Sequence, residues 1–239
     1  MHVLILRLQG PLMSFGDVAI DEVRPTRRLP PRSMLTGLLA NALGWSHRDV
    51  AALDRLQERL RFAARLDRNG QGLVDFQTAE LGKNDPLWTT RGTPAERAGG
   101  AASYSGPALR YRHYIADAAV TVALTLVPAE EAPDLAALEA ALRRPERPLF
   151  IGRKGCPPGR PVLDGVVAAE SLVGALDQAT PRRPDQGSVD LLVETEDEPA
   201  EPKGQRLIGV ADRRDWRLGL HAGQSRRREL RRPLSAAAS

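Results

Sequence analysis

The segment Val3-Leu4-Ile5-Leu6-Arg7-Leu8 opens the pattern of elements that decides the fold of this chain. It is short and almost wholly apolar, which is typical of a β-strand. Gln9-Gly10-Pro11 follows directly and ends it, because glycine and proline interrupt regular structure. The sequence therefore predicts that the chain begins with a strand.

Two amphipathic helices are expected next. Pro30-Pro31 blocks a helix, and Ser33 then has the position and the side chain of an N-cap. Apolar residues follow Ser33 at helical spacing, and Gly44 fits the C-cap. The spacing of apolar residues also predicts a helix over Asp49–Leu60.

The following elements complete an alternation of strands and helices. Arg61–Asp67 and Leu73–Thr78 flank the turn Asn69-Gly70, so a hairpin is expected. Further along, the chain is predicted to form the strand Val120–Val127, the helix Leu135–Leu142 and the short strand Leu149–Ile151. The order strand, helix, strand, strand, helix, strand is that of a ferredoxin-like or RRM-like fold, so an α+β protein is predicted.

A long insertion and a different C-terminal region accompany this pattern. Ala79–Leu109 is rich in glycine and proline, and loops of this length are usually functional or disordered. The later elements expected are Val166–Ala169, Leu172–Leu176, Ser188–Glu194, Arg206–Val210 and Asp215–Leu220. The predicted divisions are 1–78 with 110–178 as the main domain, 79–109 as an insertion, 179–225 as a smaller, mostly β region and 226–239 as a basic mobile tail.

Positive charge is concentrated locally. Net charge is only +4, yet the 34 basic residues include just three lysines, Lys83, Lys154 and Lys203. Arginine pairs with phosphate and stacks on bases, although a GC-rich genome produces the same bias. The segment 181–204 carries three basic and seven acidic residues, whereas 205–239 carries nine basic and three acidic residues. Local basic patches of this kind are candidate polyanion sites.

Composition and motifs disfavour several other classes. The chain has 239 residues, 42% hydrophobic and 27% charged, which is typical of a globular protein. No run approaches the roughly 20 apolar residues that a membrane span needs. The N-terminus lacks the basic start, the long apolar stretch and the cleavage site of a signal peptide. Cys156 is the only cysteine, so no internal disulfide is possible and a cytoplasmic location is expected. The four histidines are scattered and Cys156 has no recognisable partner base, so we assign no catalytic residue, metal or cofactor.

The segment Leu109–Tyr114 alternates arginines with aromatic side chains, which is the combination that holds single-stranded RNA. A strand here would place Arg110, Arg112 and Tyr114 on one face and Tyr111 and His113 on the other. We expect the first face to bind RNA. In the competing interpretation, Tyr114 belongs to the core and the arginines are solvated.

Two further basic segments are candidate phosphate sites. The first holds four arginines that lead into the helix capped by Ser33: Arg24, Arg27, Arg28 and Arg32. A helix N-terminus attracts anions and is destabilised by basic residues. Arginines at this place therefore indicate that an anion binds nearby. The second is the glycine-flanked loop Gly152-Arg153-Lys154-Gly155, whose backbone can approach a phosphate closely, although a solvated turn explains it equally well.

Several motifs occur in the order typical of one family. They are Leu6–Gly16, Arg24-Pro25-Thr26, Pro31-Arg32-Ser33 with Gly37-Leu38-Leu39 and Leu43-Gly44, Asp75–Thr78, Arg112–Ala118 and Leu149–Pro157. Together they resemble the CasD family of type I-E CRISPR Cascade subunits. The resemblance extends from Leu4 to Pro161 and is weaker beyond, chiefly around Arg213–Trp216. Gly155 stands where the family usually has serine, and Phe15 where it often has tryptophan.

The resemblance implies a RAMP-type, RRM-like palm domain in which 79–109 takes the place of the family's thumb. It implies a subunit that binds the 5′ handle of crRNA, caps the guide-bearing backbone, contacts the backbone and large subunits and thereby supports binding of target DNA. It also implies that precursor RNA is cut by a separate protein. The RNA-binding residues expected are Gln9, Gly10, Arg24, Arg27, Arg28, Arg32, Ser33, Arg110, Arg112, Tyr114, Gly152, Arg153 and Lys154.

Two alternatives remain open on the sequence. The first is a metal-independent endoribonuclease, as type I-C relatives are thought to be, with His113 or Tyr114 and Lys154 as its acid–base and charge-stabilising groups. The second is a general RRM-like interaction module. The type I-E motifs favour the non-catalytic subunit.

Overall fold

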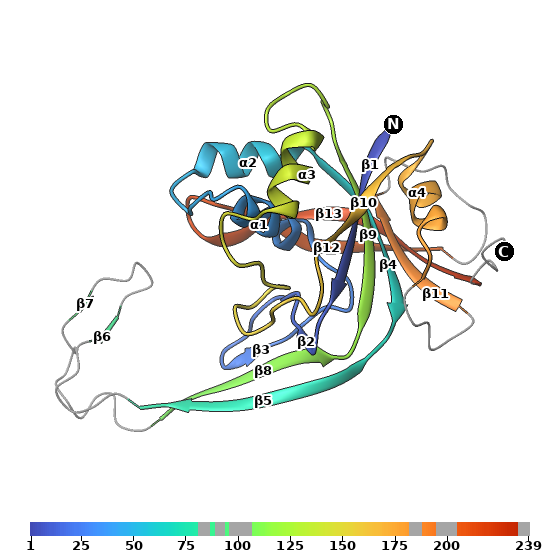
Figure 1. Ribbon diagram of the computed structural model, residues 1–239. Coiled ribbons are helices and arrows are strands. Elements are labelled where there is room, and N and C mark those ends of the chain that lie inside the picture. The colour runs from blue at the N-terminus through green and yellow to red at the C-terminus, as the bar shows by residue number, and fades with distance from the viewer. Residues whose placement is uncertain (81–86, 89–93, 96–106, 182–187, 195–204, 234–239) are drawn as a thin grey trace.

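The computed structural model describes residues 1–80, 87–88, 94–95, 107–181, 188–194 and 205–233. Its main feature is a seven-stranded sheet in the order β10-β1-β9-β4-β11-β13-β12 (Figure 1). All neighbouring strands in this sheet are antiparallel. The strands are β1 (His2–Gln9), β4 (Leu60–Arg68), β9 (Ala119–Leu126), β10 (Leu163–Ala168), β11 (Ser188–Glu194), β12 (Gln205–Asp215) and β13 (Leu220–Pro233).

The strands β10-β1-β9-β4 form the ferredoxin-like part of the sheet. The helices α1 (Arg32–Ala42) and α2 (Val50–Arg59) connect β1 to β4, and α3 (Leu135–Arg143) lies between β9 and β10. The α+β, ferredoxin-like prediction is confirmed. The short strand expected at Leu149–Ile151 is wrong, because this segment is irregular and β10 takes its place at the sheet edge.

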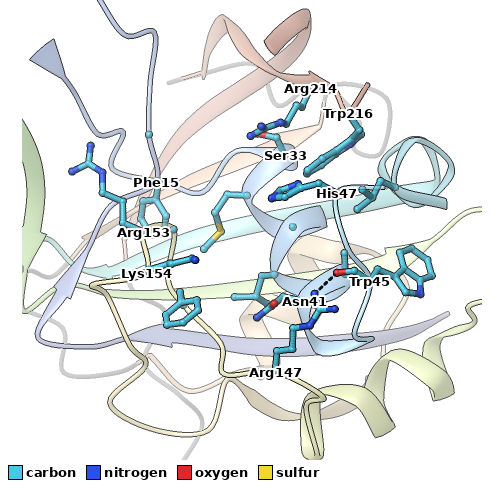
Figure 2. Close-up of a pocket in the computed structure, with 18 of the residues that line it drawn as sticks. Phe15, Ser33, Asn41, Trp45, His47, Arg147, Arg153, Lys154, Arg214 and Trp216 are labelled. Carbon is cyan, nitrogen blue, oxygen red and sulfur yellow. Dashed lines mark hydrogen bonds between the residues drawn. The ribbon is translucent and has the colours of Figure 1, made fainter. Parts of the chain in front are cut away.

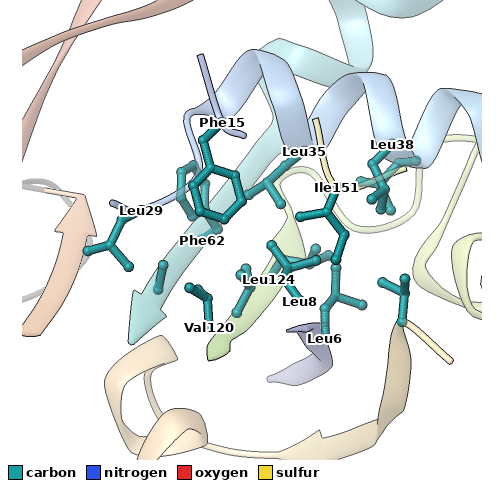
Figure 3. Packing of buried hydrophobic residues seen from close by; sticks show 14 of the residues in the cluster. Leu6, Leu8, Phe15, Leu29, Leu35, Leu38, Phe62, Val120, Leu124 and Ile151 are labelled. Atoms are coloured by element: carbon teal, nitrogen blue, oxygen red, sulfur yellow. The ribbon is translucent and has the colours of Figure 1, made fainter. Parts of the chain in front are cut away.

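Each face of the sheet buries its own hydrophobic cluster, because side chains alternate along a strand. Leu4, Leu6 and Leu8 of β1 belong to the larger cluster, together with apolar residues of α1, α2 and α3 (Figure 3). Val3 and Ile5 belong to the other cluster, which α4 (Leu172–Gln178) covers. The sheet is therefore held between helices, with α1 on the face that carries the larger cluster.

A second sheet departs from the first at Gly70. Here β8 (Ala108–Ala116) pairs with β2 (Leu12–Met13), with β3 (Val23–Arg24) and with β5 (Gln71–Ala79), and β5 and β8 extend as a curved arm (Figure 1). The predicted hairpin is wrong, because β4 pairs with β9 and β5 with β8. Gly70 has φ +64°, and a Cβ there would lie 2.3 Å from the carbonyl oxygen of Ala116, so this turn moves the chain between sheets.

The insertion begins at the far end of this arm. The short strands β6 (Leu87–Trp88) and β7 (Pro94–Ala95) pair with each other. The expectation that 79–109 is a mobile thumb falls mostly outside the residues that the structure describes.

The C-terminal strands extend the main sheet. β11 pairs with β4 and β13, and β13 pairs with β12. The basic mobile tail expected from residue 226 is wrong as far as Pro233, because these residues form the second half of β13. The strand expected at Asp215–Leu220 is also wrong, since the chain turns there between β12 and β13.

Candidate nucleic-acid interface

The loop after Ile151 is a compact turn packed on the segment that follows β1. The Ile151 amide donates to the carbonyl of Cys156 at 2.8 Å, and the Ser14 amide donates to the carbonyl of Ile151 at 3.2 Å. Gly152 has φ +91°, and a Cβ there would lie 1.6 Å from the Ser14 carbonyl oxygen. Only glycine fits this position, so the backbone approach fixes the course of the loop.

Gln9 and Gly10 support the same loop. The Gly159 amide donates to the carbonyl of Gln9 at 2.8 Å. A Cβ on Gly10 would lie 2.7 Å from the carbonyl oxygen of Pro157. The structure thus brings together three of the predicted residues, Gln9, Gly10 and Gly152.

Arg153 joins this loop to the second sheet. Its guanidinium donates to the carbonyls of His113 and Arg24, each at 2.9 Å. Its Cζ also lies 4.8 Å from the centroid of the Tyr114 ring, a cation–π contact. These contacts hold Arg153 within the fold, whereas the adjacent Lys154 is exposed.

Tyr114 packs in the core. It is 9% exposed and belongs to the larger hydrophobic cluster. Residues 108–116 form the strand β8, so Arg110 and Arg112 lie on the same face, as predicted. In the register with β5, Arg112 lies opposite Asp75 and Arg110 lies opposite Gln77. The expected stacking of Tyr114 on a base is wrong, since the ring is buried and Arg153 covers one face.

An exposed aromatic pair lies on the arm formed by β5 and β8. The rings of Phe76 and Tyr111 have centroids 5.0 Å apart. Both side chains are exposed, and they stand opposite each other in the register of the two strands. The sequence analysis placed Tyr111 on the face away from the arginines but did not identify its partner.

The four arginines that lead into and begin α1 have different surroundings. Arg27 pairs with Asp17 at 2.6 Å, and Arg28 with Asp190 at 3.2 Å. Arg24 donates to the carbonyl of Val23 at 3.0 Å. These contacts within the protein do not test whether Arg24, Arg27 and Arg28 bind RNA, so the three RNA contacts stay predictions.

Arg32 is the exception, because it is buried. Its side chain is 6% exposed and donates to the carbonyls of Gln57 and Leu60. Burial, and next the positive charge of Arg227, lower its pKa to about 9. Arg32 holds α1 against the end of α2, so its assignment as an RNA contact is wrong.

The anion at the start of α1 is a side chain of the protein itself. The N-cap is Pro31, and the helix has no side-chain cap, so the N-cap predicted at Ser33 is wrong. Asp212 of β12 accepts from the Arg32 amide at 3.4 Å and pairs with Arg227 at 2.9 Å. The start of α1 therefore has an anion of the protein itself, Asp212, and does not require a phosphate.

A pocket of about 500 Å³ lies between α1, the Gly152–Lys154 loop and the turn after β12 (Figure 2). Four of the predicted residues line it: Ser33, Gly152, Arg153 and Lys154. The sequence analysis missed Asn41, Trp45, Arg147 and Trp216 among its other lining residues. The scarcity of tryptophan, with three in the chain, was the one available signal.

The two acid–base candidates for RNA cleavage have different surroundings. Tyr114 is buried, whereas His113, the preceding residue in β8, points to the opposite face and is partly exposed. Among the described residues, no group of three or more His, Cys, Asp or Glu side chains could hold a metal ion. No helix in the part of the chain that the structure describes is long and apolar enough to cross a membrane.

Cys156 is expected to resist alkylation in the folded protein. It is fully buried, and this burial raises the pKa of its thiol above the ordinary value of 9.0. Because the thiolate is the reacting form, labelling near neutral pH should be slow and should become fast in denaturant. Thiol titration with and without guanidinium measures both rates, and equally fast labelling would contradict the buried position.

Comparison with known proteins extends the pattern found in the sequence. The model of the family CRISPR-associated protein (Cas_Cas5) matches residues 3–228. The CRISPR system Cascade subunit CasD of Escherichia coli (strain K12) is 33% identical over 181 residues, which cover 72% of this chain and 75% of that protein. The resemblance to the CasD family is therefore confirmed.

Solved structures give the same result. A chain of a CRISPR RNA-guided surveillance complex matches with a TM-score of 0.66 and 28% identity, over 97% of this chain and 89% of that chain. A crystal structure of a Cas protein matches with a TM-score of 0.61 and 28% identity, over 97% and 94%. With the family match over residues 3–228, these likenesses show that the chain belongs to the family CRISPR-associated protein (Cas_Cas5).

Proposed function

We propose that this protein is the non-catalytic subunit of a type I-E CRISPR Cascade surveillance complex that binds the 5′ handle of crRNA. In this role it caps the guide-bearing backbone, contacts the backbone and large subunits and supports interference with target DNA. The family match and the identity to a Cascade subunit support the assembly. The role requires no cofactor.

The observation that carries handle binding is the shape of the Gly152–Lys154 loop. Its backbone is held against Ser14 by a contact that only glycine allows, and Arg153 is anchored to the second sheet. Lys154 then projects from a rigid base and lines the pocket beside α1. A cation on an anchored loop beside a pocket is suited to a single-stranded RNA segment.

Purification of this protein with the other Cascade subunits, followed by sequencing of the bound RNA, tests the proposal. We expect mature crRNA with an intact 5′ handle. A complex that assembles equally well around RNA without the handle would contradict the assigned role.

A cleavage assay separates this function from the endoribonuclease alternative. The purified chain is incubated with precursor repeat RNA in the presence of a chelator, and the products are resolved by length. We expect intact RNA, because Tyr114 is buried and the family resemblance implies that a separate protein cuts the precursor. Specific cutting within the repeat would overturn the non-catalytic assignment.

Lys154→Ala should weaken binding of handle RNA and make its salt dependence less steep. Each lost phosphate contact to a single strand lowers the slope of log affinity against log salt by about 0.7. Titrations of labelled handle RNA over a salt series measure this change for the purified chain.

Arg206→Ala is the matched control for this titration. Arg206 is also exposed, but it lies at the opposite end of β12 from the pocket residue Arg214. It should leave the slope unchanged. An equal change in both variants would indicate a general effect of net charge and no contact at Lys154.

A further inference from the structure

The pocket beside α1 has walls suited to a flat aromatic group. Phe15, Phe150 and Trp216 line it from three separate segments, and α1 contributes Met34 and Leu38 (Figure 2). Its volume of about 500 Å³ lies in the range of small-molecule sites. Aromatic side chains of this kind hold unstacked nucleobases through their π-faces.

Trp216 is a mostly buried part of the pocket wall. The residue is 6% exposed, and its indole Nε1 is covered by the protein, with no acceptor among the residues that the structure describes. What Trp216 offers a ligand is therefore its aromatic ring.

Cations surround the aromatic walls. The Cζ of Arg214 lies 5.2 Å from the Trp216 ring, and Lys154 reaches the pocket from the facing loop (Figure 2). Arg147 donates to the carbonyls of Gly44 and Trp45, each at 2.7 Å, so its charge is fixed beside α1. An aromatic interior with cations around it fits a base that remains attached to its phosphate.

Gly37 lines the pocket where α1 approaches the edge of the Trp216 indole. It lies inside the helix, where glycine is disfavoured relative to alanine. A Cβ at this position would lie 3.7 Å from Cη2 of Trp216, an ordinary contact. Alanine therefore fits at this position, whereas a longer side chain would extend toward the indole.

We propose that this pocket binds one unstacked nucleobase of the crRNA handle, with the base packed against the aromatic side chains that line the pocket. The inference rests on the proposed function and adds a base-binding site to the phosphate contact at Lys154. It assigns Trp216, Gly37 and Arg214 to RNA binding; the sequence placed them in segments that resemble the family but not among the expected RNA contacts.

Abasic crRNA combined with a pocket-filling variant tests this proposal in the reconstituted complex. Each handle nucleotide is made abasic in turn, and retention of the RNA is measured for the wild type, Gly37→Leu and Gly37→Ala. In the wild type and in Gly37→Ala, one abasic position should weaken retention about tenfold, as expected for a lost stacked base. In Gly37→Leu, intact and abasic RNA should bind alike at that position.

The comparison is internal to each variant, so a general loss of stability does not imitate the result. Trp216→Leu, which removes the aromatic ring from the opposite wall, should also abolish the difference if Gly37→Leu does not assemble. An abasic penalty that is the same in all variants, or absent at every position of the wild type, would overturn the pocket assignment and leave handle binding in place. A wild-type complex that retains no handle RNA would overturn the proposed function and the pocket assignment with it.

Discussion

Asp212→Ala should lower the free energy of unfolding by about 3–5 kcal/mol, because it removes one member of a buried ion pair. The side chains of Asp212 and Arg227 are 1% and 0% exposed, and they pair at 2.9 Å. Arg227 also lies over the ring of Phe62, with its Cζ 4.4 Å from the centroid. The same carboxylate accepts a hydrogen bond from the backbone amide of Arg32, so the substitution also removes an acceptor at the start of α1.

Denaturant unfolding measures this loss, and Asp190→Ala provides the matched control. Asp190 also pairs with arginines of distant segments, Arg28 and Arg231, but these partners are 59% and 66% exposed. Exposed pairs contribute about 0–1 kcal/mol, so the control should change stability little. A similar loss of unfolding free energy in the two variants would show that burial does not make the Asp212 pair more stabilising than the exposed pairs of Asp190.

Gly152→Ala should reduce the affinity for handle RNA about tenfold or more. A left-handed backbone at a residue with a Cβ costs about 1–2 kcal/mol, which is close to a factor of ten when binding requires the native loop. The clash of the new Cβ with the Ser14 carbonyl oxygen, at 1.6 Å, adds to this strain. RNA titration together with the melting temperature separates loss of the loop from loss of the fold.

Gly155→Ala is the control within the same loop. A Cβ on Gly155 would meet no atom within 4 Å, and its φ lies outside the left-handed range. Binding should therefore remain near that of the wild type. Gly155→Ser, which introduces the residue usual in the resembling family, should be tolerated for the same reason. Equal losses at 152 and 155 would contradict the assigned role of the Ser14 contact.

Local sequence patterns were sufficient to predict those strands and helices in which the spacing of apolar residues matches the period of the element. The strands β1 and β9 and the helices α2 and α3 lie close to their predicted bounds, because apolar spacing reflects burial directly. The order of the motifs along the chain was also sufficient to identify the family. The hairpin at Asn69-Gly70 failed, because a turn signal does not say which strands will pair across it.

Side-chain roles depended on contacts between distant parts of the chain. Arg32 and Tyr114 matched the chemistry of RNA binding, yet both are buried by residues far from them in sequence. The anion at the start of α1 is Asp212, 180 residues from Arg32, and no local pattern connects the two.

The amino-acid sequence by itself determined the ferredoxin-like order of elements, the family and the glycine-flanked basic loop. Only the tertiary structure decided which arginines are buried, and it alone assembled Gly37, Trp216 and Lys154 around one pocket. The physical reason is that spacing along the chain specifies which face of an element a residue occupies. The neighbours of that face are set by how other elements pack against it, as α1 and the turn after β12 do around the pocket.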